Sequence, residues 1–243
     1  MKKLYIIKAG TTFSSTLETL GDFDDWIKTA LCQPELPVAV VDVVQGCPLP
    51  SPEECSGVIV TGSHAMVTDN LPWSLKIESW IPSLVASVVP FLGICYGHQL
   101  LGRAMGGEVG YNPNGKEIGT VAISLTGDSK SDPLFKCTPS IFLAHTTHAQ
   151  SVLKLPLDAL LLASNAHEPH HAYRIGSSAW GVQFHPEYTA EIMQAYLTAQ
   201  AESLRKKGRN VENLFLEVTA TPFARKVLSN FGSLVRDRII AES

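Results

Sequence analysis

A cysteine flanked by glycines stands where an apolar run meets a helical pattern, in Gly93-Ile94-Cys95-Tyr96-Gly97. In a nucleophile elbow, the residues two before and two after the central one are small because neighbouring chain passes too close for a Cβ. Such a turn sets the thiol beside the first free N–H groups of the next helix, which favour a thiolate and can stabilise an oxyanion. The sequence therefore predicts a nucleophilic Cys95. The motif alone leaves open the alternative of an inert, buried cysteine in an ordinary strand-to-helix turn.

His185 is the histidine best placed to act as a base for that thiol. Of the eight histidines, it alone follows an apolar strand pattern, residues 180–184, and precedes a carboxylate by two positions, in His185-Pro186-Glu187. Residues i and i+2 of an extended chain point the same way, and the proline keeps this segment extended. Because a base needs an orienting partner, we expect Glu187 to fix the tautomer of His185. Taken without its neighbours, His185 would be interpreted as a core histidine.

The other histidines carry less information. His98 follows Cys95 by three residues and is expected to pack its helix against the sheet. His167, His170 and His171 resemble a metal cluster, but no partner motif accompanies them. We therefore expect a surface loop there, and no metal site.

Composition indicates a soluble α/β protein without nucleic-acid or membrane partners. The 243 residues are 45% hydrophobic and 17% charged, and the net charge of -4 gives no reason to expect phosphate binding. The basic run 205–209 is interpreted as a solvated helix end, with a binding patch as the alternative. The N-terminal apolar stretch is too short for a signal peptide or a membrane span. Five cysteines, an odd number with no C-x-x-C pair, favour a reducing cytoplasm.

In the first part of the chain, short β-branched runs alternate with helical patterns. Strands are predicted over residues 4–8, 38–43, 57–61 and 89–94, and helices over 16–31, 73–88 and the segment after Cys95. Pro82 either counts against the second helix or predicts a kink in it. The alternation favours an α/β fold with a mostly parallel sheet covered by helices on both faces.

The second part of the chain has a different pattern. Short β-rich runs separated by turn residues occupy 120–125, 140–144, 160–164, 171–175 and 179–184. They are expected to form antiparallel additions and the far edge of the sheet. Helices are predicted over 189–207 and 222–240, and they complete the fold.

Three segments together resemble the class I glutamine amidotransferase family, in its stand-alone, GMP-synthase-like form. They are residues 57–63, 93–99 and 181–187, the last of which contains Phe-His-Pro-Glu. The resemblance covers residues 4–188. It implies a single flavodoxin-like α/β domain over 1–243, with C-terminal helices from about 189.

The resemblance also implies a mechanism and a set of roles. Glutamine would lose its side-chain amide as ammonia through a γ-glutamyl thioester on a Cys-His-Glu triad, without a cofactor. In that triad Cys95 is the nucleophile, His185 the base and acid, and Glu187 the orienting carboxylate. The remaining roles fall to the Tyr96 backbone N–H and the Gly62-Ser63 turn as oxyanion donors, to Gln99, which helps to seat the substrate, and to His145 on a substrate-binding loop.

Two departures from the family pattern bear on the substrate. Many members have two glycines and a proline where this chain has Thr61-Gly62-Ser63-His64, and a His-Gly-Asp type of run where it has Ala144-His145-Thr146-Thr147-His148. Thr61-Gly62-Ser63 followed by Asp69, together with the changed loop 145–148, is similar to relatives that act as γ-glutamyl peptidases.

Three functions follow from these observations. The first is a glutaminase or amidotransferase that releases ammonia for an acceptor. Because no second catalytic domain is expected, the acceptor site would lie on a separate synthetase subunit. The second is a γ-glutamyl peptidase or hydrolase, which uses the same thioester but releases an amine or peptide. The third is a non-catalytic binding protein of the same fold.

Overall fold

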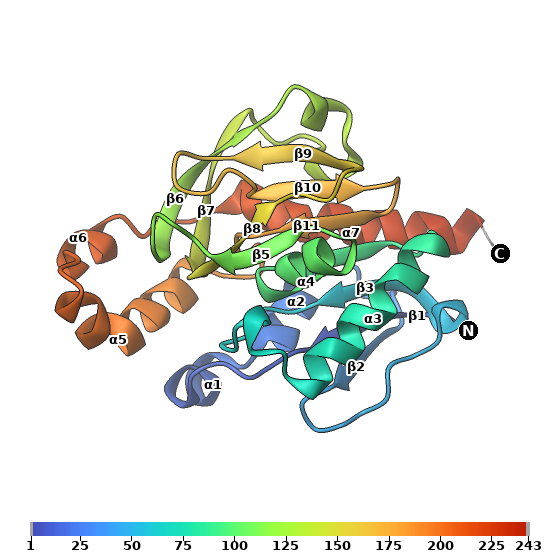
Figure 1. The fold of residues 1–243 in the computed structure, drawn as a ribbon, viewed down its shortest axis with the longest axis horizontal. Coiled ribbons are helices and arrows are strands. Elements are labelled where there is room, and N and C mark those ends of the chain that lie inside the picture. The colour runs from blue at the N-terminus through green and yellow to red at the C-terminus, as the bar shows by residue number, and fades with distance from the viewer. Residues whose placement is uncertain (1, 242–243) are drawn as a thin grey trace.

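A nine-stranded sheet forms the centre of the protein, whose computed structural model describes residues 2–241 (Figure 1). Its strands are β1 (Lys3–Lys8), β2 (Val38–Asp42), β3 (Cys55–Val60), β4 (Phe91–Ile94), β6 (Glu117–Leu125), β7 (Ile141–His148), β9 (Ala159–Ser164), β10 (Ala172–Ile175) and β11 (Ala179–Val182). Their order is β2-β1-β3-β4-β11-β10-β9-β6-β7. The strands from β2 to β11 in that order are parallel, and those from β11 to β7 are antiparallel. The predicted parallel sheet with antiparallel edge additions is thus confirmed.

A second, two-stranded sheet was not predicted. It pairs β5 (Glu108–Tyr111) with β8 (Gln150–Lys154) in antiparallel register. β5 has only four residues, one of them a glycine, and β8 follows β7 after a single residue, so neither gives a separate alternating pattern.

Helices cover both faces of the large sheet and extend from one end of it. They are α1 (Ser14–Leu20), α2 (Phe23–Leu31), α3 (Pro72–Ala86), α4 (Tyr96–Ala104), α5 (Ala190–Lys206), α6 (Val211–Leu216) and α7 (Pro222–Ala241). Short 3-10 turns are η1 (Pro52–Glu54), η2 (Val67–Asp69), η3 (Asp128–Ser131) and η4 (Pro133–Phe135). α3 continues through Pro82, and α6 was not predicted.

The single helix predicted over 16–31 is wrong in one respect, because the chain forms two helices there. Gly21 has a φ of 80° and ends α1. Asp22 then caps α2: its side chain accepts a hydrogen bond from the Phe23 N–H, and Asp25 reaches back to the Asp22 N–H. This capping box fixes a new helix start although the apolar spacing continues across the break.

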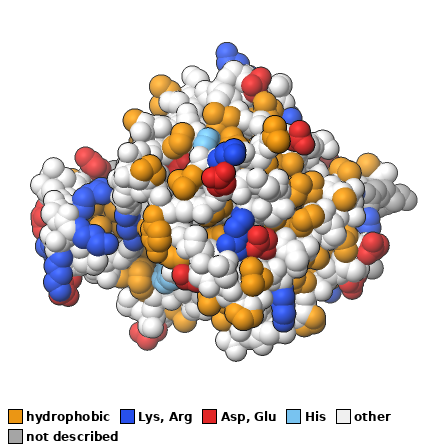
Figure 2. Space-filling model, in the orientation of Figure 1, with side chains coloured by type: hydrophobic (Ala, Val, Ile, Leu, Met, Phe, Trp, Pro, Cys, Tyr) orange, Lys and Arg blue, Asp and Glu red, His pale blue; other side chains and the backbone are white. Residues whose placement is uncertain are grey.

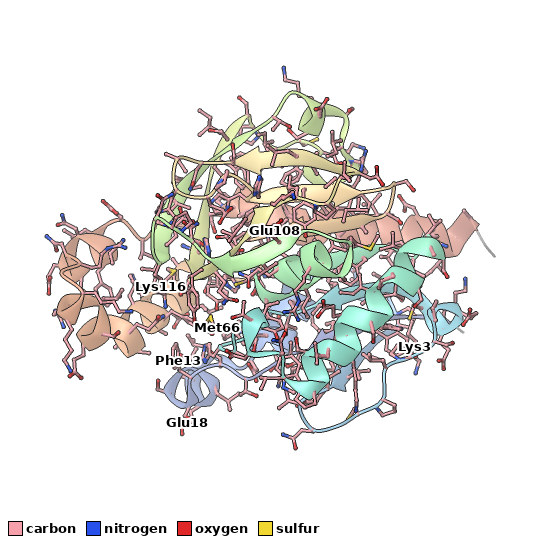
Figure 3. The ribbon with its side chains drawn as sticks, viewed as in Figure 1. Lys3, Phe13, Glu18, Met66, Glu108 and Lys116 are labelled. Atoms are coloured by element: carbon pink, nitrogen blue, oxygen red, sulfur yellow. The ribbon has the colours of Figure 1, made fainter. Side chains whose placement is uncertain are left out.

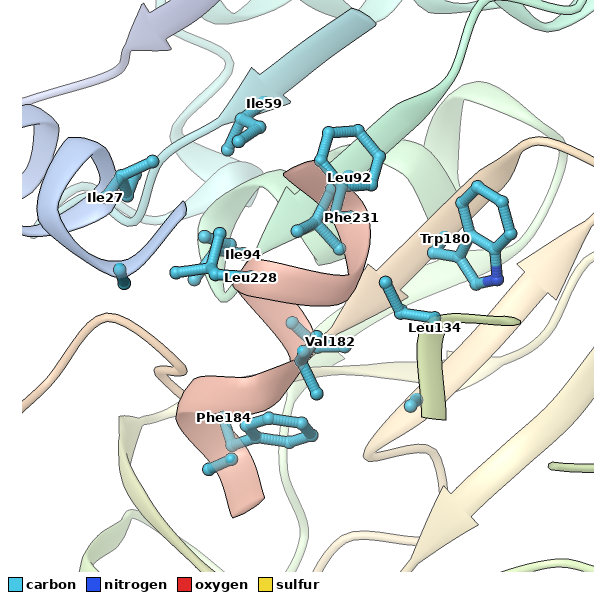
Figure 4. Packing of buried hydrophobic residues seen from close by; sticks show 14 of the residues in the cluster. Ile27, Ile59, Leu92, Ile94, Leu134, Trp180, Val182, Phe184, Leu228 and Phe231 are labelled. Atoms are coloured by element: carbon cyan, nitrogen blue, oxygen red, sulfur yellow. The ribbon is translucent and has the colours of Figure 1, made fainter. Parts of the chain in front are cut away.

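Side chains that alternate along the parallel strands pack into two separate cores. On one face Ile59 and Leu92 pack with α7 residues Leu228 and Phe231 and with Ile27 of α2 (Figure 4). On the other face, residues one position away in β3 and β4 pack against α3 and α4. A strand that is buried on both faces has a continuous apolar sequence, and this explains why these strands could be predicted.

A third core holds α5 and α6 against α2 at one end of the molecule (Figure 1). Trp26 of α2 meets Tyr188 and Tyr196 edge-on, with ring centroids 5.5 and 6.5 Å apart. This packing brings one face of α5 to the carboxyl ends of β4 and β11. Between residues 2 and 241, no helix has the length and apolar character needed to cross a membrane, and each of the five cysteines is free.

Candidate functional site

Cys95 lies between β4 and α4 on a backbone conformation that non-glycine residues rarely adopt. Its φ is 50° and its ψ is -93°. Holding a residue in such a region costs about 1–3 kcal/mol and is common at functional sites. The side chain is 6% exposed and lines a cavity. The strained turn therefore presents the thiol to an open space at the start of α4.

The glycines on either side of Cys95 are required by the neighbouring backbone. A Cβ on Gly93 would lie 2.3 Å from the carbonyl oxygen of Gly97, and one on Gly97 would lie 2.5 Å from the carbonyl oxygen of Val60. Both distances are far shorter than any real Cβ contact. This is the close approach on which the elbow interpretation depends.

The Gly93→Ala substitution is expected to destabilise the protein by about 1–3 kcal/mol, since the new methyl group must displace backbone. It should also slow alkylation of the Cys95 thiol, because the turn that presents it shifts. Urea unfolding and the rate of thiol labelling measure these effects. Gly127→Ala is the control, because no atom lies within 4 Å of its Cβ position. If Gly93→Ala matched Gly127→Ala in both measurements, the elbow would not require a glycine there.

His185 and Glu187 form the expected pair. Nδ1 of His185 lies 2.7 Å from Oε1 of Glu187, and both residues are buried. The His185 ring stacks on Tyr188 with centroids 4.1 Å apart, and its backbone N–H donates to the His145 carbonyl at 2.8 Å. These contacts fix the ring and leave Nε2 without a hydrogen-bond partner in the described chain. That nitrogen is the one available to Cys95.

The electrostatics of this pair favour a charged imidazolium. Burial lowers the pKa of His185, but the carboxylate of Glu187 and the sulfur of Cys95 outweigh burial and raise that pKa to about 10. Histidine ordinarily titrates near pH 6.5. His185 can therefore carry a proton at neutral pH beside the Cys95 thiol.

The three residues predicted as oxyanion donors lie on or next to the cavity that Cys95 lines. Tyr96 is the first residue of α4, where backbone N–H groups have no acceptor within the helix. Gly62 lies against the His185 ring, since a Cβ there would be 3.0 Å from Cε1. Ser63 and Tyr96 both line the cavity. These positions fit a developing negative charge close to the Cys95 sulfur.

The cavity above Cys95 has a volume of about 320 Å³, in the range of small-molecule sites. One wall is aromatic and the other is polar. Figure 3 labels Phe13, Met66 and Lys116, three lining residues from distant parts of the sequence that meet at this cavity. The full lining consists of Phe13, Phe23, Ser63, His64, Ala65, Met66, Cys95, Tyr96, Gln99, Lys116, Thr147, His148, Ala149, Gln150, His185, Tyr188, Tyr196 and Gln200.

Of the two predicted substrate-binding residues, only Gln99 lies on the cavity. Its Nε2 donates to the Gln150 carbonyl at 2.7 Å and to Gln183 Oε1 at 3.0 Å. His145 is fully buried, with Nδ1 3.1 Å from Thr120 Oγ1, and is not among the cavity lining in the described structure. Burial, and next the charge of His185, lower the pKa of His145 to about 4. His145 is therefore a neutral support for the His185 backbone rather than a direct contact to the cavity.

The comparison with protein families agrees with this geometry. The model of the family "Glutamine amidotransferase class-I" matches residues 19–202. The chain belongs to this family. The family predicted from the sequence is thus confirmed.

Relatives within the amidotransferase family carry out more than one reaction. A GMP synthase (glutamine-hydrolyzing) from Aeropyrum pernix is 31% identical over 148 residues, 59% of this chain and 27% of that protein. Gamma-glutamyl peptidase 5 from Arabidopsis thaliana is 30% identical over 153 residues, 58% of this chain and 57% of that protein. A gamma-glutamyl-L-1-hydroxyisopropylamide hydrolase from a Pseudomonas species is 27% identical over 198 residues, which are 78% of this chain and 64% of that protein. The chain thus matches less than two thirds of each relative's length.

Solved structures share the fold over nearly all of the chain. A glutamine amidotransferase from Thermotoga maritima has a TM-score of 0.75 and 22% identity, and the match covers 98% of this chain and 99% of that one. One from Methylobacillus flagellatus has a TM-score of 0.75 and 25% identity, with 95% and 94% covered. The likeness to the first of these concerns the fold alone.

Behind the polar wall, this amidotransferase-family chain buries a carboxylate that the sequence did not reveal. Glu117 Oε2 lies 3.1 Å from His148 Nε2 and 3.2 Å from His171 Nε2. Asn165 donates to the other oxygen at 2.8 Å. The expectation of a surface loop is therefore wrong for His171, which has no exposed surface. No group of three or more potential ligands among residues 2–241 is arranged to hold a metal ion.

The Glu117→Gln substitution is expected to destabilise the protein by about 2–3 kcal/mol at pH 7. Burial opposes the charge of Glu117, but His148 and His171 outweigh it and hold the pKa well below its ordinary 4.5. A carboxyl group whose pKa is lowered on folding stabilises the fold at pH values above its pKa in the unfolded chain. That contribution is lost progressively as the pH falls below about 4.5. Urea unfolding from pH 7 to pH 3 should therefore show a difference between wild type and variant that shrinks with acidity. A difference independent of pH would contradict the assignment.

Several cavity residues had no signal in the sequence. Phe13, His64 and Tyr196 form an aromatic cluster, with ring centroids 4.3 Å apart for Phe13 and His64 and 5.1 Å for Phe13 and Tyr196. Lys116 reaches the same cavity from the loop before β6. These residues are separated by long stretches of chain and follow no motif, so only the fold brings them together.

Proposed function

We propose that this chain hydrolyses γ-glutamyl amide bonds through a γ-glutamyl thioester on Cys95, with His185 as acid and base and Glu187 as its orienting partner. The observation that carries the proposal is a strained Cys95 that shares one cavity with a His185 whose other nitrogen is held by Glu187. Family membership supports amide chemistry at this fold.

In the first step the Cys95 sulfur attacks the γ-carbonyl carbon of the substrate. A C–S bond forms, and the carbonyl electron pair moves to oxygen. The oxyanion is stabilised by the Tyr96 backbone N–H and by an N–H from the Gly62-Ser63 turn. A charged His185, favoured by its raised pKa, stabilises the thiolate that attacks.

In the second step the intermediate collapses and the C–N bond breaks. His185 donates its proton to the departing nitrogen, which leaves as ammonia or as an amine. Water then attacks the thioester while His185 accepts a proton. The C–S bond breaks, the γ-carboxylic acid leaves and loses its proton to solvent, and the Cys95 thiolate beside a charged His185 is restored.

Glutamine is the first substrate that we propose, with ammonia as the leaving group. The name of the Aeropyrum pernix relative describes glutamine hydrolysis by a GMP synthase. An amidotransferase passes its ammonia to an acceptor, so this form of the proposal implies a separate synthetase subunit as the partner.

A γ-glutamyl peptidase or hydrolase is the second candidate, and the shape of the cavity favours it. Tyr188, Tyr196 and Phe13 line the same cavity as Cys95 and His185, which has a volume of about 320 Å³. Ammonia needs no such space, whereas an amine or amino acid would occupy it. Relatives named as γ-glutamyl peptidase and γ-glutamyl amide hydrolase are consistent with this candidate.

Turnover of glutamine and of γ-glutamyl dipeptides by the same preparation tests the proposal. We expect glutamate release from at least one of them, and intact mass spectrometry should detect a γ-glutamyl adduct on Cys95 at short times. Faster turnover of glutamine would favour the amidotransferase, and faster turnover of the dipeptides the peptidase. If neither gave glutamate or an adduct, the non-catalytic binding protein would be the better explanation.

A further inference from the structure

A second cavity adjoins the one above Cys95 and has a strongly basic lining. Its volume is about 220 Å³, and it shares Lys116 and Gln200 with the first cavity. Lys207 and Arg209 also line it, and its lining includes no acidic residue from the described chain. Figure 2 shows Lys and Arg side chains gathered over the end of the molecule that α5 and α6 form. Lys116 and Gln200 therefore form a common wall between the cavity above Cys95 and a second cavity with cationic lining.

The cations of this second cavity differ from their neighbours in the basic run 205–209. Arg205 and Lys206 each have an acidic partner, at 2.7 and 2.6 Å. Across residues 2–241, Lys207 and Arg209 have no carboxylate within ion-pair distance. All four cations of this run are exposed, as expected for a solvated helix end, and Lys207 and Arg209 also line the second cavity.

Lys116 stands at the junction of the two cavities without an acidic partner among the described residues. Its Nζ donates to Oε1 of Gln200, a neutral acceptor. Burial, and next the charge of Lys207, lower the pKa of Lys116, while Cys95 raises it. A half-buried cation surrounded by other cations gains more from a bound anion than an exposed one does.

A continuous series of contacts links His185 to the second cavity. The His185 ring stacks on Tyr188, whose ring lies 4.9 Å from that of Tyr196. Gln200 donates to the Tyr196 carbonyl at 3.2 Å and accepts from Lys116. A leaving group that receives its proton from His185 starts at the first member of this series, and the cations stand at its other end.

The opposite wall suits the γ-glutamyl half of a substrate. Cys95 Sγ lies 4.0 Å from the Thr147 carbonyl oxygen, and Gln99 fixes the Gln150 carbonyl at 2.7 Å. Backbone carbonyls and amides of this kind fit an amino acid's ammonium and chain. With the γ-glutamyl ammonium on this wall, the cations of the second cavity remain for a carboxylate of the substrate.

We propose that Lys116, Lys207 and Arg209 form a subsite for the carboxylate of the leaving amino acid, so that the preferred substrates are γ-glutamyl amino acids or peptides with a free carboxylate. This inference rests on the proposed function and specifies its substrate class. Arg209 Nη1 donates to the Lys116 carbonyl at 3.0 Å, which ties the two cationic residues together.

Calorimetric binding to the Cys95→Ala variant tests the subsite without turnover. The probes are γ-glutamylalanine and γ-glutamylalanine amide, which differ only in the distal carboxylate. Adding Lys207→Gln and Arg209→Gln is expected to weaken binding of the acid about tenfold and of the amide less than twofold. Higher salt should weaken binding of the acid more than binding of the amide. Arg205→Gln with Lys206→Gln makes the same charge change on the same helix end and should alter neither.

Three results would overturn the subsite: equal weakening for both probes, no weakening for either, or no binding of the acid to Cys95→Ala. Hydrolysis of γ-glutamylalanine amide by the wild-type chain tests the proposed function separately, because that compound lacks the distal carboxylate. If the enzyme were active but bound both probes equally, the thioester chemistry would be supported and the subsite contradicted.

Discussion

Replacing Cys95 with alanine is expected to lower the turnover number at least about 10⁴-fold with whichever γ-glutamyl substrate the wild type hydrolyses. The thiol supplies the electrons of the thioester bond, and no neighbouring group in the site replaces them. Only binding and oxyanion stabilisation remain, which leave a small residual rate. Glutamate release, measured under saturating substrate, checks the prediction.

The fold should survive this substitution. Alanine carries the same Cβ as cysteine and so meets the same backbone constraint at the φ of 50°. Cys47→Ala serves as the control, because Cys47 is an exposed free cysteine. It should keep full activity and still form the covalent adduct with a glutamine-like alkylating agent. If Cys95→Ala retained more than a tenth of the wild-type rate while folded, the thioester mechanism would be wrong.

Strands buried on both faces are the part of the fold that the sequence predicts best. β3 and β4 are continuous apolar runs, and their neighbours along the chain supply helices with clear spacing. The break between α1 and α2 was missed because the apolar spacing continues across Gly21. Asp22 and Asp25 have the spacing of a capping box and would have located the new helix start.

Sequence reasoning locates the residues that we propose as catalytic but not those that form the cavity walls. Cys95 carries its own local motif, and the partners His185 and Glu187 are two residues apart, so short-range geometry suffices for each. The partners of Glu117 and Lys116 are set by the fold. Lys116 meets an acceptor 84 residues away, and Glu117 meets His148 31 residues away. No periodicity or motif encodes such pairs.

The Glu187→Gln substitution is expected to lower the turnover number by about 10²–10⁴-fold at pH 7. Glutamine keeps the size of the side chain but loses its charge. Burial then dominates at His185, whose pKa should fall from about 10, since the carboxylate is one of the groups that raise it. The ring also loses the partner that fixes its tautomer, so it protonates the leaving nitrogen less effectively.

The Glu187→Gln substitution should also shift the pH–rate profile in a definite direction. With Glu187 in place, His185 should keep its proton until the pH approaches about 10, where the rate of the acylation step falls. In Glu187→Gln that alkaline limb should move to lower pH. A histidine pKa raised on folding stabilises the protein fully below about 6.5 and loses its effect as the pH rises through the folded value. The stability deficit of the variant should therefore be largest at neutral and acidic pH.

A matched loss of carboxylate elsewhere separates these effects from a general change in charge. Glu35 is exposed, so Glu35→Gln should leave both the turnover number and the alkaline limb unchanged. Rate profiles from pH 6 to 10.5, together with urea unfolding at each pH, make the comparison. If Glu187→Gln kept the wild-type limb and lost less than threefold in rate, Glu187 would not orient His185. A large rate loss with an unmoved limb would assign Glu187 to positioning alone and leave the raised pKa to the sulfur of Cys95.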